Sequence, residues 1–332
     1  MAKIVLGMGS SHGPMLSAPP EQWDARVPAD RMNKEHYYKG RTWTFDELVK
    51  ERANEDLGKQ ITMDVWRERH GRCRAALDKL AAVFEEVKPD VAVIVGNDQR
   101  EIFQADNTPA MAVYWGETIV NNDFDEEHLA KLPPGVAISV PGHTPPGGAA
   151  YKGLPGLGRH IIENTIADDF DITAVTKMAG DHTPHAFGFI YRQIMKDKVV
   201  PNVPVILNTF YPPNQPTVER CYDLGKSLVK AIESWDSDAR VALIASGGLT
   251  HFVIDEQVDE AVLDAMRNRE IRGVASLGEN IFQAGTSEVK NWVPVAGAMA
   301  DLNYDLNIVD YVPCYRSEAG TGNAMGFVYW KA

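Results

Sequence analysis

Residues 63–98 read MDVWRERHGRCRAALDKLAAVFEEVKPDVAVIVGND, and this stretch decides the fold class. Between residues 63 and 87, apolar side chains recur at the spacing of one helix face, which predicts a helix. The apolar run 91–96 follows, bounded by Pro89 and by a polar Asn-Asp pair, and is typical of a buried strand. A helix that leads directly into a wholly apolar strand indicates a sheet with helices packed against it.

The same alternation recurs along the chain. Further strands are expected at residues 3–9, 110–116, 171–178, 203–213 and 239–248, and further helices at 157–170, 185–195, 218–235 and 286–301. This order predicts an α/β fold with helices flanking a central sheet. Residues 18–62 are polar and aromatic and are expected to form irregular structure with short helices. Residues 121–157 are rich in Gly and Pro and are expected to form a long surface loop, a feature that often acts as a lid.

The composition is that of an ordinary globular protein, with 332 residues of which 44% are hydrophobic and 24% charged. A formal net charge of −13 repels phosphate backbones, so nucleic acid is not expected as a partner. No apolar run approaches the roughly 18 residues of a membrane span, and the N-terminus shows no signal-peptide pattern. The cysteines, Cys73, Cys221 and Cys314, lie far apart and fit reduced thiols in the cytoplasm.

Polar or glycine-rich turns follow several expected strands: GSSH at 9–12, GNDQ at 96–99, NTFYPP at 208–213 and SGGLTH at 246–251. In open α/β sheets, ligands bind at such strand ends. The sequence contains no P-loop, no Rossmann glycine fingerprint and no G-x-S-x-G motif, so nucleotide binding and serine-hydrolase chemistry have little support. The histidines and carboxylates of these turns are therefore the candidates for chemistry.

Each histidine of these turns has a structural and a functional interpretation. His12 is either a solvated loop residue or a metal ligand. His251 follows a Gly-Gly turn and is either bonded to a backbone carbonyl or part of a site, because glycine lets backbone pass close to a ligand. His182 and His185 are either two ligands or one acid–base residue with a bystander, and Asp181 could orient either one. The other histidines are expected to be surface or structural residues: His36, His70, His128, His143 and His160.

Glu288 lies at the start of the expected helix 286–301, directly after Thr286 and Ser287. Either hydroxyl is suited to cap that helix, and a glutamate in the first turn complements the helix dipole. Helix formation alone therefore explains Glu288, and a role as a ligand needs a further argument.

Four stretches together resemble the class III extradiol ring-cleavage dioxygenases, the superfamily of the protocatechuate 4,5-dioxygenase β subunit. They are SSHGPML at 10–16, NTFYPPNQPTVERCYDLGKSLVKAIESW at 208–235, SGGLTHF at 246–252 and GTSEVKNWVPVAGAM at 285–299. The resemblance runs from residue 3 to about residue 327, with residues 18–75 as an apparent insertion. It implies one catalytic domain over 1–332 with a mixed central sheet, and its nearest subgroup is the gallate and methylgallate dioxygenases.

The resemblance also implies a site. The family holds a non-haem Fe(II) with two histidines and one glutamate, leaving open positions for substrate and O2. Carried over by position, His12 is the first histidine ligand and Glu288 is the carboxylate ligand. His251 matches the acid–base histidine. His185 matches a second pocket histidine, with His182 as the alternative.

One position departs from the family pattern. The second histidine ligand of the family follows an Asn-Asp pair, and here Gln99 stands at that place. Three interpretations stay open: Gln99 is a weaker oxygen ligand, another histidine fills the place, or the metal site is altered. The candidate histidines are His182, His36 and His70.

The implied reaction is extradiol cleavage of a catecholic aromatic acid of the protocatechuate, gallate or methylgallate type, with both atoms of O2 entering the product. Candidate substrate-binding residues are Ser10, Thr209, Tyr211 and Arg316, together with Arg100. The family further implies a homo-oligomer and leaves room for a separate small helical subunit. The alternative is a superfamily member with an altered or lost iron site, acting as a non-oxygenase enzyme or a binding protein.

Overall fold

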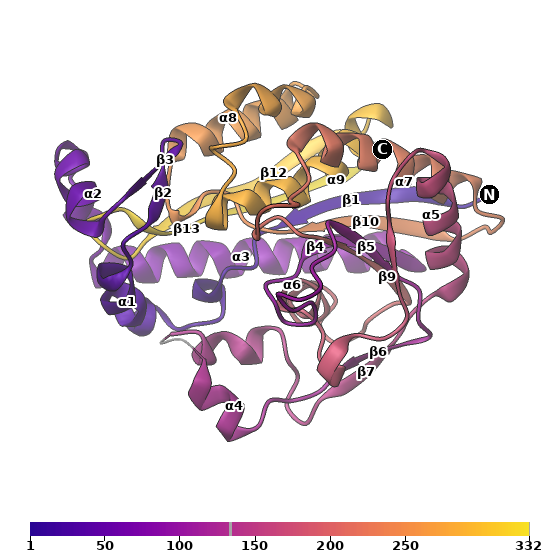
Figure 1. The fold of residues 1–332 in the computed structure, drawn as a ribbon, viewed down its shortest axis with the longest axis horizontal. Helices are drawn as coiled ribbons and strands as arrows, with labels where there is room; N and C mark the ends of the chain where they lie inside the picture. The colour runs from indigo at the N-terminus through magenta and orange to yellow at the C-terminus, as the bar shows by residue number, and fades with distance from the viewer. Residues whose placement is uncertain (133–134, 332) are drawn as a thin grey trace.

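A mixed β-sheet runs through the middle of the computed structural model, which describes residues 1–132 and 135–331 (Figure 1). Within those ranges the sheet has nine strands, in the order β11-β13-β1-β10-β4-β9-β5-β8, with β12 paired to β13. Its strands are β1 (Lys3–Ser10), β4 (Val91–Asn97), β5 (Met111–Tyr114), β8 (Thr173–Val175), β9 (Asn202–Leu207), β10 (Arg240–Ser246), β11 (His251–Val253), β12 (Asp305–Tyr315) and β13 (Thr321–Lys331). The predicted α/β fold with a central mixed sheet is confirmed.

The middle of the sheet is parallel, because β1, β10, β4 and β9 pair in the same direction. Strands β13 and β5 run antiparallel to their neighbours β1 and β9 on either side of this block. The carboxyl ends of the parallel strands therefore meet at one edge of the sheet, which brings Ser10, Ser246 and Asn97 together. This is the edge at which ligands bind in open α/β sheets.

Helices cover both faces of the sheet. Side chains of β4 alternate between two cores: Val91, Val93 and Val95 face one, while Ala92 and Ile94 face the other. The helices α5 (Pro155–Ala167), α7 (Val218–Ser234), α8 (Glu256–Arg267) and α9 (Val289–Asp301) contribute to the first core, and α3 (Met63–Val87) and α6 (His185–Phe189) to the second (Figure 1). Burial on both faces explains why the central strands are continuously apolar. Among the described residues, no helix combines the length and apolar character needed to cross a membrane.

The helix predicted over 63–87 is confirmed at both ends. The Thr62 hydroxyl accepts a hydrogen bond from the Val65 amide and caps the first turn, and Lys88 adopts a left-handed conformation that ends the helix. Because α3 packs on the sheet, Trp66 and Cys73, which lie within the expected insertion, belong to the second core.

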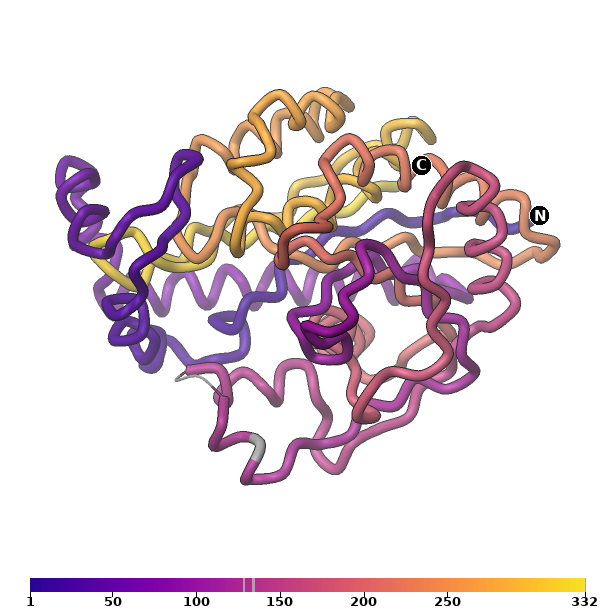
Figure 2. Tube along the Cα trace, in the orientation of Figure 1, coloured from indigo at the N-terminus to yellow at the C-terminus, as the bar shows by residue number. Residues whose placement is uncertain are grey.

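The segment 18–62 forms short helices, as expected from its composition, and also a hairpin that was not expected. Its regular elements are α1 (Val27–Met32), β2 (His36–Tyr38), β3 (Arg41–Trp43) and α2 (Phe45–Glu51). The segment lies at one end of the molecule, beside the turn that joins β12 and β13 (Figure 2). There a buried ion pair joins Arg316 Nε to Asp30 Oδ2 at 2.7 Å, and Thr321 Oγ1 donates to the same carboxylate. The buried pair fixes the segment to the sheet.

The expectation of a plain loop over 121–157 is wrong. The structure places β6 (Thr118–Asn121) antiparallel to β7 (Ala149–Lys152), and α4 (Glu126–Lys131) lies between them. The two strands pair across more than twenty-five residues of sequence, so no local pattern reveals them. Gly148 has a φ of +74°, a conformation suited to glycine, directly before β7.

Candidate metal centre

His12 follows β1 at the ligand-binding edge of the sheet and is buried. Its Nδ1 lies 2.9 Å from Ser246 Oγ, and that hydroxyl donates its single proton to the Ala186 carbonyl at 2.5 Å. Ser246 must therefore accept the bond from His12, so Nδ1 carries the hydrogen and Nε2 bears a lone pair. Burial lowers the pKa of His12 more than the Glu288 carboxylate raises it, which favours this neutral form.

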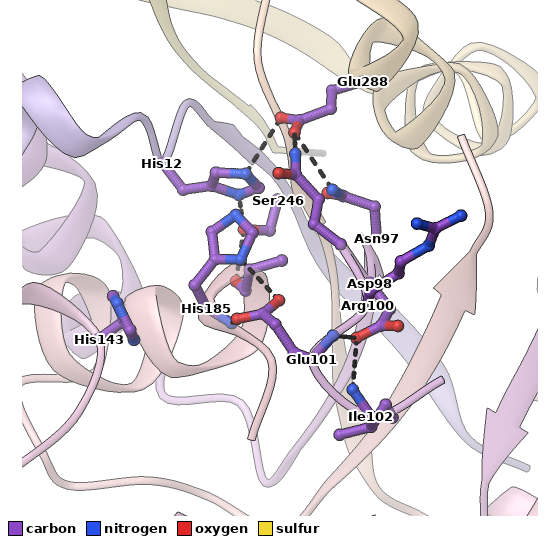
Figure 3. Close-up of polar contacts among 12 residues, drawn as sticks. His12, Asn97, Asp98, Arg100, Glu101, Ile102, His143, His185, Ser246 and Glu288 are labelled. Carbon is purple, nitrogen blue, oxygen red and sulfur yellow. Dashed lines mark hydrogen bonds and ion pairs between the residues drawn. The ribbon is translucent and has the colours of Figure 1, made fainter. Parts of the chain in front are cut away.

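Glu288 ends a short 3-10 helix, Ala284–Glu288, directly before α9. Its Oε2 lies 3.0 Å from His12 Nε2 (Figure 3). Its Oε1 accepts hydrogen bonds from the side-chain amides of Gln99 at 2.7 Å and Asn97 at 3.1 Å. Burial raises the pKa of Glu288, but His12 and His251 outweigh it and hold the pKa well below the usual range, so the carboxylate is charged.

The helix-capping explanation of this region is wrong. The Thr286 hydroxyl donates to the His251 carbonyl at 3.1 Å, and α9 begins without a side-chain cap. Because the Glu288 carboxylate bonds to groups across the sheet edge, its position is set by the site rather than by the helix.

The facing atoms of His12 and Glu288 suit a metal ion. Among the described residues, His12 Nε2 and Glu288 Oε2 are buried atoms that have no hydrogen-bond partner. Two unpaired lone pairs 3.0 Å apart repel one another unless a cation or a proton lies between them. With His185, they form a group of potential ligand atoms within 4.8 Å of one another. The donor set of two imidazoles and one carboxylate fits non-haem Fe(II).

His251 begins β11, and its Nε2 lies 3.6 Å from Glu288 Oε2. Its Nδ1 donates to the Leu249 carbonyl at 2.8 Å, which directs Nε2 toward the centre. Gly248 and Gly285 make room for the ring, because a Cβ atom at either position would lie within 2.6 Å of His251. Burial lowers the pKa of His251, but the Glu288 charge outweighs it and raises the pKa.

His185 begins α6 and is held by Glu101. The Glu101 carboxylate accepts from His185 Nδ1 at 2.7 Å and from its backbone N–H at 2.9 Å (Figure 3). The His185 ring meets the His12 ring edge-on at 4.7 Å between centroids. Burial lowers the pKa of His185, but the Glu101 carboxylate outweighs it and raises the pKa to about 9. The same interaction overcomes burial and lowers the pKa of Glu101 to about 2.

A cavity of about 570 Å³ opens above these groups. Its apolar wall comes from Pro14, Phe124, Leu132, Val136, Val140, Phe189 and Phe252. Arg26 and Arg100 add positive charge, and part of the wall comes from the segment 118–152. A largely apolar cavity with cationic and polar groups in its wall suits a ligand that is part apolar and part anionic.

The other site residues predicted from the sequence differ in whether they line the cavity. His182 lines the cavity, bonds through Nδ1 to the Asn122 carbonyl and stacks on Phe124. Tyr211 lies under Arg100, whose guanidinium carbon is 4.1 Å from the ring centroid. Arg316 is engaged with Asp30. Ser10, Thr209, Tyr211 and Arg316 are not among the described residues that line the cavity.

Of the remaining histidines, some lie away from the centre and one lines the cavity. His36 Nε2 donates to the Asp30 carbonyl, and the His70 ring contacts Trp23, so neither approaches the centre. His160 bonds to Ser234 on the surface. The His128 side chain lies outside the described part of the structure.

His143, expected to be a surface or structural residue, lines the cavity instead, with its ring centroid 6.0 Å from that of His185. Burial, and then His185, lower the pKa of His143 to about 4.

Sequence reasoning missed Glu101, Ser246 and Asn97 as parts of the centre, besides His143. Asn97 and Ser246 lie in turns that the sequence marks as strand ends. Because parallel strands end at the same edge of the sheet, that position could have indicated that both residues lie near the site. Glu101 follows Gln99 by two residues in the same turn. Its pairing with His185 depends on folding, because 84 residues separate the two in sequence.

Comparison with known proteins agrees with this geometry. Residues 62–320 match the family model described as the catalytic LigB subunit of aromatic ring-opening dioxygenase. The match covers most of the chain, so the chain belongs to this family. The class III extradiol dioxygenase superfamily expected from the sequence is confirmed.

Two known proteins are similar to this chain, one over part of its length and the other over nearly all of it. Gallate dioxygenase from Pseudomonas putida is 34% identical over 158 residues, which span 45% of this chain and 46% of that enzyme. The chain thus matches less than half the length of this curated relative. The crystal structure of the uncharacterised protein JW3007 from Escherichia coli K12 aligns over 98% of this chain and 99% of its own, with a TM-score of 0.47 and 14% sequence identity.

Proposed function

We propose that the protein is an extradiol ring-cleavage dioxygenase that uses Fe(II) and O2 to open a catecholic aromatic acid of the protocatechuate, gallate or methylgallate type. The observation that carries the proposal is the pair of unpartnered lone pairs on His12 Nε2 and Glu288 Oε2 at the floor of a large cavity. Membership of the ring-opening dioxygenase family supports the same activity.

His12 and Glu288 would hold the ion. When bound, Fe(II) supplies a Lewis acid for two adjacent substrate hydroxyls and an electron donor for O2. His251 Nε2 faces the same carboxylate and accepts a hydroxyl proton from the substrate, because its Nδ1 is already committed to Leu249. His251 holds that proton and returns it as the ring opens. Both oxygen atoms enter the product, so the reaction needs no external reductant.

The cavity wall would orient the substrate. Phe189 and Phe252 present flat apolar surfaces beside the centre. Arg100 lines the cavity, next to Gln99 in sequence, and a guanidinium is suited to bind the carboxylate of an aromatic acid. The predicted substrate residues Ser10, Thr209 and Tyr211 would act from behind this wall, Tyr211 by supporting Arg100.

The test is anaerobic reconstitution with Fe(II), then measurement of metal content and of O2 uptake with protocatechuate, gallate, 3-O-methylgallate and catechol. We expect uptake with at least one acid, and loss of both bound iron and uptake in His12→Ala. Arg100→Ala should raise KM for the acid by about tenfold or more and leave KM for catechol unchanged, because only the acid has a carboxylate to lose. An iron-loaded protein that consumes no O2 with any of the four contradicts the proposal.

Gln99 favours a second candidate, a family member whose altered centre serves a non-oxygenase enzyme or a binding protein. Its amide donates to Glu288 where the family has a histidine ligand. This candidate predicts binding of a catecholic acid without O2 uptake in the same experiment. The cytoplasmic location, the homo-oligomer and the separate small helical subunit stay predictions, which fractionation and size-exclusion chromatography would check.

A further inference from the structure

The departure at Gln99 leaves the proposed iron centre one histidine short, and the side-chain nitrogen of Gln99 is used to hold Glu288. Its Nε2 donates to Glu288 Oε1 at 2.7 Å. A charged carboxylate only accepts hydrogen bonds, so the amide must present its nitrogen there. That nitrogen has no lone pair to give a metal ion, so Gln99 has only its carbonyl oxygen to offer, a weaker ligand than an imidazole nitrogen. Gln99 therefore holds Glu288 in place, together with Asn97.

His185 lies where a third ligand is needed. Its ring is adjacent to His12, and its potential ligand atom belongs to the same group within 4.8 Å as those of His12 and Glu288. Figure 3 shows His185 between His12 and Glu101. The group draws on three separate parts of the fold: the end of β1, the start of α6 and the 3-10 helix before α9.

Glu101 determines which atom of His185 is offered. Its two carboxylate oxygens accept from the Nδ1–H and from the backbone N–H of the same residue, which fixes both the ring and the start of α6. With Nδ1 facing the carboxylate, Nε2 is the atom left to face the centre. A carboxylate that accepts from the far nitrogen of a metal-bound histidine is a common way to orient that ligand and raise its basicity.

We propose that His185 is the third protein ligand of the metal centre, in place of the histidine missing at Gln99, and that Glu101 is the positioning residue that holds it. This inference rests on the proposed function, because it needs a resident metal ion. It makes the centre a set of two histidines and one glutamate in which one histidine comes from α6 instead of the turn after β4.

The test is Fe(II) affinity, measured without oxygen by competition with a chromogenic chelator, so no turnover is needed. Glu101→Ala should lower the affinity about 10- to 100-fold. His185→Ala should lower it further. In the His185→Ala background, adding Glu101→Ala should change nothing more, since Glu101 acts through His185. His160→Ala is the control: a surface histidine bonded to Ser234, whose loss should leave the affinity unchanged.

A rescue separates loss of a ligand from loss of folding. Gln99→His should restore Fe(II) affinity to His185→Ala, because it returns a histidine to the turn that already contacts Glu288. If His185→Ala binds Fe(II) normally while Gln99→Ala and His12→Ala do not, the third-ligand inference is overturned and the proposed function stands. If the wild-type protein and His12→Ala bind Fe(II) equally, both are overturned.

Discussion

At the scale of single residues, the centre depends on which ring nitrogen of each histidine carries a proton. Ser246 settles this for His12, because its own proton is committed to the Ala186 carbonyl. The Leu249 carbonyl does the same for His251, and Glu101 for His185. In each case Nδ1 is the donor and Nε2 faces the centre. On His185, whose pKa is raised to about 9, a metal ion would have to displace a proton from Nε2. A metal ligand and a proton acceptor both act through a lone pair on Nε2. Contacts to neighbouring residues therefore decide which of the two roles each histidine takes.

Exchanging His251 for alanine tests this division of roles. His251 lies farther from Glu288 than His12 does, at 3.6 Å compared with 3.0 Å, and we assign it proton transfer. We expect His251→Ala to keep its Fe(II) and to lose about 100-fold or more in kcat, the usual contribution of a general base. Iron analysis and O2 uptake on the same sample measure the two quantities. Full activity in this variant would remove His251 from the mechanism.

Local pattern placed His12, His251 and Glu288 in turns at strand ends or at a helix start, and the family resemblance supplied the roles expected of them. Neither could show that Gln99 donates to Glu288 or that Glu101 holds His185, because those contacts join positions 189 and 84 residues apart. The residues that orient a site are ordinary in sequence, and only the fold brings them together.

At the scale of elements, the turn that presents His251 depends on α8 packed behind it. Asp259 of α8 accepts from the amide and the hydroxyl of Thr250 at 2.7 and 2.8 Å, and from the Tyr311 hydroxyl of β12 at 2.7 Å. The carboxyl is buried among these partners. Burial raises its pKa to about 7, above the ordinary value of 3.8. One carboxyl thus joins a helix, a strand and the residue before His251.

This buried carboxyl predicts a pH dependence of stability. Above about pH 4 the unfolded chain releases the Asp259 proton while the folded protein keeps it, so the free energy of unfolding falls as pH rises from about 4 to about 7. The loss is up to about 4 kcal/mol, at about 1.4 kcal/mol per pKa unit. In Asp259→Asn this contribution is absent, so urea unfolding at pH 5 and pH 8 should show a smaller difference than in the wild type. Asp264→Asn, with an exposed carboxylate on the same helix, should retain the wild-type difference.

Elements with a strong local pattern were predictable, and elements defined by distant pairing were not. The helix α3 and the strand β4 were evident because amphipathic spacing and an apolar run are local properties. The strands β12 and β13 were absent from the sequence prediction. Strand β13 lies between β1, β11 and β12, and these neighbours bury even its polar residues Thr321 and Asn323. Their burial comes from the sheet, so hydropathy alone could not show it.

At the scale of the whole molecule, the centre joins distant parts of one chain. His12 follows the first strand, His185 begins a helix in the middle of the chain, and Glu288 precedes the last helix. The elements between them fold into a single sheet with two cores. Without a cation, this arrangement leaves buried lone pairs of His12 and Glu288 facing one another, which opposes folding. A bound metal ion would remove that repulsion and, with His185 as the proposed third ligand, would link the three segments in the folded state only.

Metal binding should therefore stabilise the entire fold. A ligand that binds only the folded state at 100 times its dissociation constant adds about 2.7 kcal/mol to the free energy of unfolding. We expect anaerobic Fe(II) to raise Tm by a few degrees, and a chelator to reverse the rise. His12→Ala should abolish the shift. His70→Ala, which removes a histidine outside the centre, should retain it. An equal shift in the wild type and His12→Ala would mean that the ion binds at another site.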